Sequence, residues 1–162
     1  MTLRHFKAVE EAAKDESRIK IFFGGSIELG KAEDWQTKLA DELATHDLSD
    51  RIDIYNPRRS GAWKTEWMNN YESGPFYDQV DWELRHQNDA DLIVYYFAAD
   101  TISPITLLEL GLFHAQKPVI GADPKYLRIG NLMITKNHFG FDVNLGWDAF
   151  LAALKNRLDK LA

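Results

Sequence analysis

Residues 92–98 read Leu-Ile-Val-Tyr-Tyr-Phe-Ala, and this stretch indicates the fold more clearly than any other part of the sequence. Its side chains are apolar or aromatic throughout, without the alternation of a strand that has one face in water. A continuous run of this kind is typical of a strand in a parallel sheet, because both faces of such a sheet are covered. We therefore expect residues 92–98 to form a central, buried strand.

Segments typical of strands and helices alternate on both sides of this stretch. Further strands are expected at 19–23, 52–55 and 118–120, with a fifth near 132–135, and helices at 31–45, 76–89, 104–116 and 147–161. This alternation predicts an α/β fold, namely a single-domain, doubly wound, parallel five-stranded sheet of flavodoxin-like or Rossmann-like type with helices on both faces. Residues 1–17 are interpreted as an N-terminal arm or helix, and residues 18–162 as the domain itself.

The composition favours an ordinary globular domain. The chain has 162 residues, with 25 acidic and 19 basic side chains and a formal net charge of −6. This length suits one domain. The acidic balance argues against a polymeric nucleic acid as partner, since that would require clustered cations. The absence of cysteine excludes disulfides, a thiolate metal site and a cysteine nucleophile.

The chain carries no sign of a membrane segment. No stretch reaches the roughly 18 apolar residues that a membrane-spanning helix needs. The segment from Met1 to Ser17 is charged throughout, which is unlike a signal peptide. We therefore expect a cytoplasmic protein with no membrane partner.

In parallel sheets of this kind, ligands bind beyond the carboxyl ends of the strands. Gly24, Gly25 and Ser26 follow the first predicted strand, and backbone amides there can face an anion. A plain tight turn is an equally good interpretation of the two glycines. Asn56 and Arg58 follow the second predicted strand and are further candidates for substrate binding.

Glu109 is the candidate for chemistry on the helix after the buried strand. Its neighbours at helical spacing include no cation, so a desolvated carboxyl group with a raised pKa is expected. The alternative is a capping box formed with Thr106. Against that alternative, Ser103 followed by Pro104 is the better helix start, with serine as the N-cap.

Acids and aromatics elsewhere supply further candidates. Asp81 and Glu83 lie about 160° apart around a helix, so only one of them can readily face a given pocket. Trp63, in the long loop 58–75, can stack on a base, although packing of the loop is an equally good explanation. No two histidines have metal-ligand spacing on one helix, and neither a metal nor another cofactor is expected.

Four stretches together resemble the nucleoside 2-deoxyribosyltransferase superfamily over about residues 19–135. The most specific is Thr101-x-Ser103-Pro104-x-Thr106-Leu107-Leu108-Glu109-Leu110-Gly111, similar to a less studied branch. The others are residues 20–26 (Lys-Ile-Phe-Phe-Gly-Gly-Ser), residues 55–59 (Tyr-Asn-Pro-Arg-Arg), and residues 81–83 (Asp-Trp-Glu) leading to 90–93 (Ala-Asp-Leu-Ile).

The resemblance implies a mechanism and an assembly. Glu109 would attack the anomeric carbon of a 2'-deoxynucleoside and form a covalent deoxyribosyl-glutamate, from which a second base takes the sugar. Glu83 or Asp81 would serve as the acid near the leaving base. Asn131 would bind the sugar's 5' hydroxyl in a neighbouring subunit, which implies a homo-oligomer, a dimer or larger.

Two positions depart from the pattern of the family. Phe22 stands where the family has a tyrosine that orients the nucleophile, and Ser103 stands where it has an acid that contacts the sugar. Ser26, Ser103, Tyr71 and Tyr77 are candidate substitutes for the missing hydroxyl, and the sequence does not choose among them.

Three functions therefore stay open at this point. The first is transfer of 2-deoxyribose between nucleobases. The second is hydrolysis of a nucleotide's glycosidic bond, with Arg58, Arg59 and the amides of residues 24–26 holding a 5'-phosphate. The third is a nucleotide-binding module that has lost turnover. In each case the partner is a small nucleoside or nucleotide, together with a nucleobase for transfer.

Overall fold

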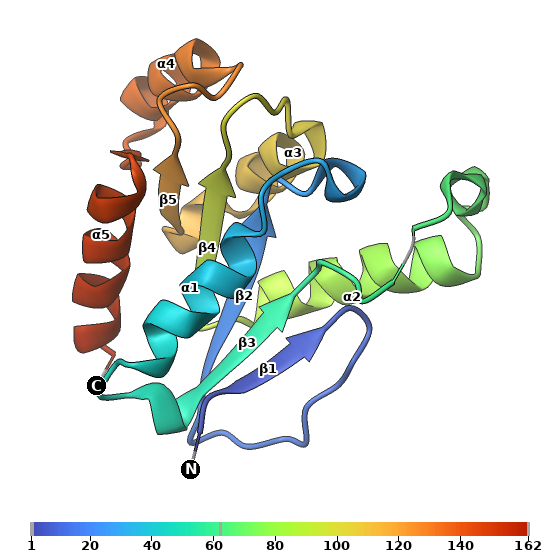
Figure 1. Ribbon diagram of the computed structural model, residues 1–162, viewed down its shortest axis with the longest axis horizontal. Helices are drawn as coiled ribbons and strands as arrows, with labels where there is room; N and C mark the ends of the chain where they lie inside the picture. The colour runs from blue at the N-terminus through green and yellow to red at the C-terminus, as the bar shows by residue number, and fades with distance from the viewer. Residues whose placement is uncertain (1, 62, 162) are drawn as a thin grey trace.

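The computed structural model describes residues 2–61 and 63–161 and shows an α/β fold built on a six-stranded parallel sheet (Figure 1). The strands are β1 (Arg4–Lys7), β2 (Ile19–Gly25), β3 (Ile52–Asn56), β4 (Leu92–Phe97), β5 (Val119–Ala122) and β6 (Asn144–Leu145). The helices are α1 (Trp35–Ala44), α2 (Pro75–Asp89), α3 (Pro104–Phe113), α4 (Ile129–Phe139) and α5 (Trp147–Asp159). Four short 3₁₀ segments also occur: η1 (Glu28–Gly30), η2 (Ser49–Arg51), η3 (Thr65–Asn69) and η4 (His114–Gln116).

The strand order is β1-β3-β2-β4-β5-β6, and every neighbouring pair is parallel. Strand β4 lies between β2 and β5, and all six of its residues are buried. The predicted flavodoxin-like, doubly wound fold is thus confirmed, with six strands in place of five. The order reverses between β2 and β4, so their carboxyl ends flank the crevice where such folds bind ligands.

One expectation about elements is wrong, and one of two alternatives for another segment is excluded. The strand expected near 132–135 lies inside helix α4, whose inward residues Ile129, Leu132, Met133 and Lys136 follow helical spacing. Gly140 ends that helix in the left-handed conformation, as is common at helix C-termini. At the other end of the chain, the helix alternative for residues 1–17 fails within the described residues 2–17, because Arg4–Lys7 pairs with β3 as an edge strand.

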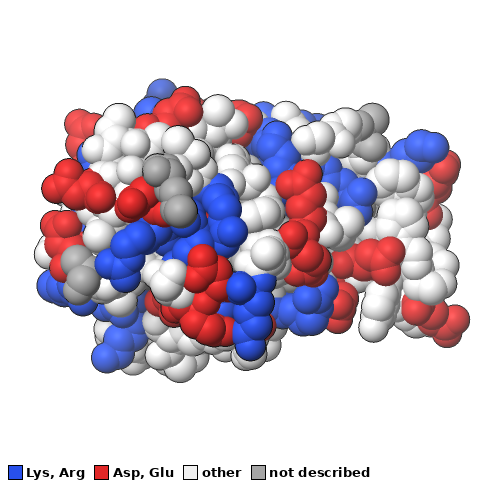
Figure 2. Space-filling model, turned by 90° about the horizontal axis from the view of Figure 1, so that it is seen from below, with Lys and Arg blue, Asp and Glu red and all other residues white. Residues whose placement is uncertain are grey.

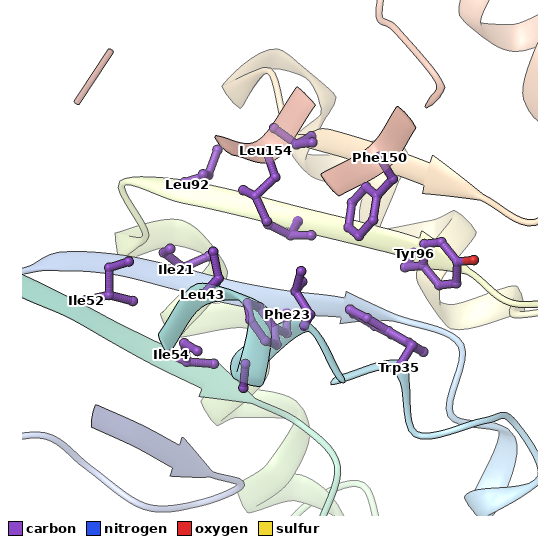
Figure 3. Close-up of a cluster of buried hydrophobic side chains, with 14 of the residues drawn as sticks. Ile21, Phe23, Trp35, Leu43, Ile52, Ile54, Leu92, Tyr96, Phe150 and Leu154 are labelled. Atoms are coloured by element: carbon purple, nitrogen blue, oxygen red, sulfur yellow. The ribbon is translucent and has the colours of Figure 1, made fainter. Parts of the chain in front are cut away.

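The sheet separates two layers of core side chains. Residues such as Trp35 and Leu43 of α1 and Phe150 and Leu154 of α5 pack on one face (Figure 3). The other face is covered by Trp82 of α2, Leu110 of α3 and Leu132 of α4. Because β2 and β4 contribute side chains to both layers, their positions are fixed from both sides.

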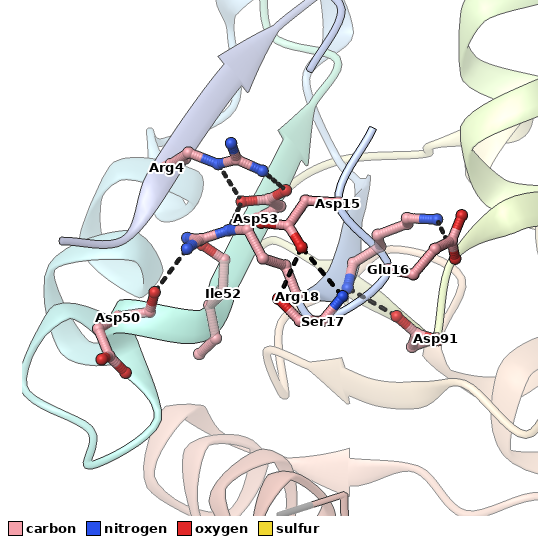
Figure 4. Close-up of polar contacts among 10 residues, drawn as sticks. Arg4, Asp15, Glu16, Ser17, Arg18, Asp50, Ile52, Asp53 and Asp91 are labelled. Atoms are coloured by element: carbon pink, nitrogen blue, oxygen red, sulfur yellow. Dashed lines mark hydrogen bonds and ion pairs between the residues drawn. The ribbon is translucent and has the colours of Figure 1, made fainter. Parts of the chain in front are cut away.

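The N-terminal strand is held by a buried carboxylate. Asp53 on β3 accepts hydrogen bonds from Arg4 on β1 and, at 2.6 Å, from Nε of Arg18 (Figure 4). The other guanidinium nitrogens of Arg18 donate to the carbonyl oxygens of Asp50 and Ile52 at 2.6 and 2.8 Å. Asp53 and Arg18 are both buried, so this pairing compensates their desolvation.

Positively and negatively charged side chains are intermixed on the face shown in Figure 2. The segment between β3 and α2 carries η3 and projects beyond the amino end of α2, at the right of Figure 1. Within residues 2–61 and 63–161, no helix is both long and apolar enough to cross a membrane.

Candidate active site

Glu109 lies inside the protein, on helix α3, which follows the central strand β4. Only 7% of the residue is exposed. One carboxyl oxygen, Oε1, accepts a hydrogen bond from Nε2 of Gln87 on α2, at 2.9 Å. The capping-box alternative does not describe this geometry, since the carboxylate is bonded to a neighbouring helix and α3 begins five residues earlier at Pro104.

Glu83 is the second carboxylate of the site and projects from α2. Its Oε1 accepts a hydrogen bond from Nε2 of Gln79, one turn earlier, at 2.7 Å. Gln79 in turn accepts from Nε of Arg59 and donates to the carbonyl of Pro57. Arg59 thereby reaches Glu83 through an amide rather than by a direct ion pair.

The two carboxyl groups influence each other. Burial raises the pKa of Glu83 to about 7. Burial, with the nearby charge of Glu83 as a second cause, raises the pKa of Glu109 to about 8. The hydrogen bonds from Gln79 and Gln87 act in the opposite direction, because they stabilise the charged forms. A pair of this kind holds a proton at neutral pH and can serve as nucleophile and acid.

Asp81 lies elsewhere on the same helix. Its carboxylate accepts from Nε of Arg85 at 2.8 Å, and the Asp81 side chain is 44% exposed. Arg85 also pairs with Glu11 in the segment after β1. Of the two acids that the sequence left open, the structure therefore brings Glu83, and not Asp81, to Glu109.

The glycine pair at the end of β2 serves the protein's own packing. A Cβ on Gly24 would overlap the ring of Tyr95, and a Cβ on Gly25 would overlap the backbone of Tyr96 and the ring of Trp35. Gly25 also has a φ of 150°, which favours glycine. The space beside the two glycines is thus occupied by neighbouring residues of the protein.

Ser26 and Ser103 belong to a buried cluster of hydroxyl groups. The Ser26 Oγ lies 2.6 Å from the Ser103 Oγ and 2.9 Å from the Thr101 Oγ1. It also accepts from the backbone N–H of Ala98 at 2.9 Å. Ser103 stands at the N-cap position but has a left-handed backbone, and its side chain does not cap α3. Instead its backbone N–H donates to the carboxylate of Glu28 at 2.7 Å.

Asn56 and Arg58 are similarly engaged within the protein. Asn56 accepts from the backbone N–H of Arg58 at 2.9 Å and contacts His5. Arg58 donates to Gln36 and to two carbonyl oxygens before α1, so its guanidinium points to that helix. Arg59, the next residue, is the arginine that lies on the side of Glu83.

Two tryptophans stand beside Arg59. Trp63 and Trp67 meet edge to face, with ring centroids 5.4 Å apart. The guanidinium carbon of Arg59 lies 5.7 Å from the Trp63 ring and 5.6 Å from the Trp67 ring, which is a cation–π arrangement. Trp63, the candidate for base stacking, is therefore packed against Arg59, which connects to Glu83 through Gln79.

Asn131 is exposed on α4 and does not meet Glu109 within one chain. It lines a groove of about 570 Å³ between α3 and α4. The groove is mostly apolar, with Leu107 and Leu110 of α3 and Leu132 and Phe139 of α4 among its lining residues. Glu109 lies on another side of α3, toward α2.

The sequence did not single out Gln87 and Tyr95, which the structure connects to Glu109. Tyr95 donates its hydroxyl proton to Oε1 of Gln87, and the Nε2 of that amide donates to Glu109. Both residues are fully buried. The sequence carried no specific signal for them beyond a polar glutamine within the predicted helix 76–89. Among the substitutes that we considered, Tyr71 and Tyr77 are exposed.

Among residues 2–61 and 63–161, no group of three or more His, Asp or Glu side chains could hold a metal ion.

The fold and the carboxylate pair define the molecule as a flavodoxin-like α/β protein with a buried acidic site beside its central strand. The chain belongs to the family described as nucleoside 2-deoxyribosyltransferase like, whose sequence model matches residues 18–126. The match includes Glu83 and Glu109 and ends before Asn131. No curated protein matches the chain.

Proposed function

We propose that this protein transfers 2-deoxyribose between nucleobases through a covalent intermediate on Glu109. The observation that carries the proposal is the pair of carboxyl groups with raised pKa values, a buried one on α3 and a partly buried one on α2, in a chain of this family. One carboxylate acts as nucleophile at the anomeric carbon and the other as acid, which is the division of roles in retaining glycosyl transfer.

In the first step an oxygen of Glu109 forms a bond to C1' as the bond from C1' to the base nitrogen breaks. The leaving base takes a proton from Glu83, so the reactive form of the pair is the one in which Glu83 carries the shared proton and Glu109 is ionised. In the second step a nitrogen of the incoming base attacks C1' and displaces the Glu109 carboxylate. Glu83 then accepts the proton that the incoming base loses.

Arg59, Trp63 and Trp67 are proposed to hold the substrate on the Glu83 side. A nucleobase can stack on an indole ring, and sequence-tolerant stacking is worth roughly 1–3 kcal/mol per base. The Arg59 guanidinium lies against the same rings. A 5'-phosphate would pair with the guanidinium of Arg59. Arg58 is less suited, because its guanidinium donates hydrogen bonds to backbone carbonyl oxygens just before α1.

A second copy of the chain is proposed to complete the site. Several large apolar side chains are exposed on and around α3 and α4, and such patches mark interfaces. They include Ile105, Leu108 and Leu112 of α3, and Leu127, Ile134 and Phe139 on or near α4. Asn131 lies beside them, where a partner subunit could receive it.

The test is an exchange assay. The protein is incubated with a 2'-deoxynucleoside or its 5'-monophosphate, with and without a free acceptor base, and the products are separated by chromatography. Exchange that needs the acceptor supports transfer. Free sugar without acceptor would show hydrolysis instead, and nucleotide binding without any product would show a module without turnover.

Matched variants assign the roles. Glu109→Ala is expected to abolish turnover, and Glu83→Gln to lower it by about 10²–10⁴-fold, the usual contribution of a general acid. Asp81→Asn changes an exposed acid on the same helix and is expected to leave the rate nearly unchanged. Loss of activity in Asp81→Asn with retention in Glu83→Gln would reverse the assignment.

A further inference from the structure

We infer that Gln87 and Tyr95 form a buried relay that positions Glu109 for attack, with Tyr95 orienting the amide and the amide orienting the carboxylate. The inference rests on the proposed function of Glu109 and adds two positioning residues to it. It also supplies, from other elements, the orientation that a hydroxyl on β2 would give, since Phe22 is buried in that layer and carries no hydroxyl group.

The direction of the relay follows from the donors. Tyr95 OH lies 2.5 Å from Oε1 of Gln87. Burial, with the charge of Glu109 as a second cause, raises the pKa of Tyr95 well above its ordinary value. Tyr95 therefore keeps its proton and donates it. The amide oxygen of Gln87 must then face Tyr95, so its NH₂ group faces Glu109.

The amide is also held from the side of its own helix. Nε2 of Gln87 lies 3.3 Å from the backbone carbonyl of Glu83, one turn earlier. Its two protons can thus serve that carbonyl and Oε1 of Glu109 together. Because Gln87 is completely buried, no water competes for these positions, and the side chain has a single satisfied orientation.

This arrangement leaves one carboxylate oxygen of Glu109 available. Oε1 accepts from Gln87, and across the described part of the chain no hydrogen bond reaches Oε2. A nucleophile needs this division, with one oxygen fixed and the other presented to the anomeric carbon. The hydrogen bond also stabilises the ionised form, in opposition to burial and to the charge of Glu83.

The test compares Tyr95→Phe with Tyr96→Phe. Tyr96 neighbours Tyr95 on β4 and is equally buried, but it packs in the opposite core layer, away from Glu109. Tyr95→Phe is expected to lower kcat by roughly 10–100-fold, the order of effect of misplacing a reacting group, with little change in KM. Tyr96→Phe is expected to keep the wild-type kcat. Gln87→Met, which keeps a similar side-chain volume, is expected to lower kcat more than Tyr95→Phe does.

A second readout does not depend on turnover. The ionisation of Glu109 is followed by NMR of its labelled carboxyl carbon in wild type, Tyr95→Phe and Tyr96→Phe. Glu83 is the titratable group that raises the pKa of Glu109, Glu109 in turn raises the pKa of Tyr95, and Arg59 lowers the pKa of Glu83. Weakening the bond from Gln87 is expected to raise the pKa of Glu109 in Tyr95→Phe alone.

The two experiments separate the relay from the proposed function. Unchanged kcat and unchanged Glu109 titration in Tyr95→Phe would overturn the relay, even in an enzyme that transfers deoxyribose. An upward pKa shift confined to Tyr95→Phe, in a protein without transferase activity, would support the relay and reject the proposed reaction. Circular dichroism of each variant identifies a general loss of folding.

Discussion

Glu109 and Glu83 are carboxyl groups that lose hydration without gaining a direct cation. Each is hydrogen-bonded to a neutral glutamine, Glu109 to Gln87 and Glu83 to Gln79. A neutral donor compensates only part of the cost of burying charge, so one proton stays on the pair at neutral pH. The chemistry that we propose depends on this residual proton.

The pH dependence of transfer follows from the pair. The rate is expected to be bell-shaped, because the nucleophile is lost when both groups are protonated and the acid is lost when both are ionised. Glu83→Gln removes the nearby charge that raises the pKa of Glu109. Its acid limb is therefore expected to move to lower pH, and its basic limb to disappear. An unchanged bell in this variant, measured as kcat against pH, would rule out Glu83 as the acid.

The stability of the protein is also expected to depend on pH because of the raised pKa of Glu109. A carboxyl group whose pKa is higher in the folded state, as for Glu109, lowers stability as pH rises from its unfolded value toward its folded value. Glu109→Gln is therefore expected to raise Tm at pH 8, by roughly 2–4 °C per kcal/mol for a chain of this size, and to change it little at pH 5. Glu72→Gln, on an exposed loop, is the control. Equal shifts at both pH values in Glu109→Gln would contradict the assignment.

Glu109 could be predicted as a functional residue from the sequence because its helical neighbours contain no cation. The resemblance to the family left Asp81 and Glu83 as the two candidates for the acid. It could not choose between them, since the side of α2 that faces α3 depends on packing. The connection of Gln87 and Tyr95 to Glu109 could not be predicted from the sequence for the same reason. Their link to Glu109 joins α2, β4 and α3, and only tertiary structure brings these elements together.

At the scale of elements, β2 and β4 are adjusted to each other where they end. Gly24 leaves room for the Tyr95 ring, and this ring carries the hydroxyl of the relay. Gly24→Ala is expected to destabilise the protein by roughly 1–3 kcal/mol, the cost of overpacking, and to displace Tyr95. Gly130→Ala, where a Cβ meets nothing within 4 Å, is the matched control. Denaturant unfolding measures both, and a neutral Gly24→Ala would show that the ring can move freely.

The elements that the sequence predicted best are those with strong periodicity or a continuous apolar run, such as α5 and β4. The least predictable element was β1. Its four residues, Arg-His-Phe-Lys, have only one aliphatic or aromatic anchor, and the strand is fixed by the pairing of Arg4 with Asp53, 49 positions away in the chain. No local pattern encodes such a contact.

At the scale of the whole molecule, the exposed apolar side chains of α3 and α4 favour a homo-oligomer. Light scattering after size exclusion is expected to give at least a dimer. Leu108→Asp, at an exposed position of α3, is expected to dissociate it and to lower transfer, because Asn131 would no longer reach a partner. Leu145→Asp, at an exposed apolar position outside that patch, is the control. A fully active monomer would contradict the shared site.

The proposed reaction requires that Glu109 carry the sugar covalently between its two steps. The most direct measurement is the mass of the protein after rapid acid quench of a reaction with a 2'-deoxynucleoside and no acceptor base. We expect a gain of one deoxyribosyl group, located by peptide mapping on Glu109, with one equivalent of free base and no adduct in Glu109→Ala. Base exchange that continues in Glu109→Ala, or a sugar attached to another residue, would contradict the proposed reaction.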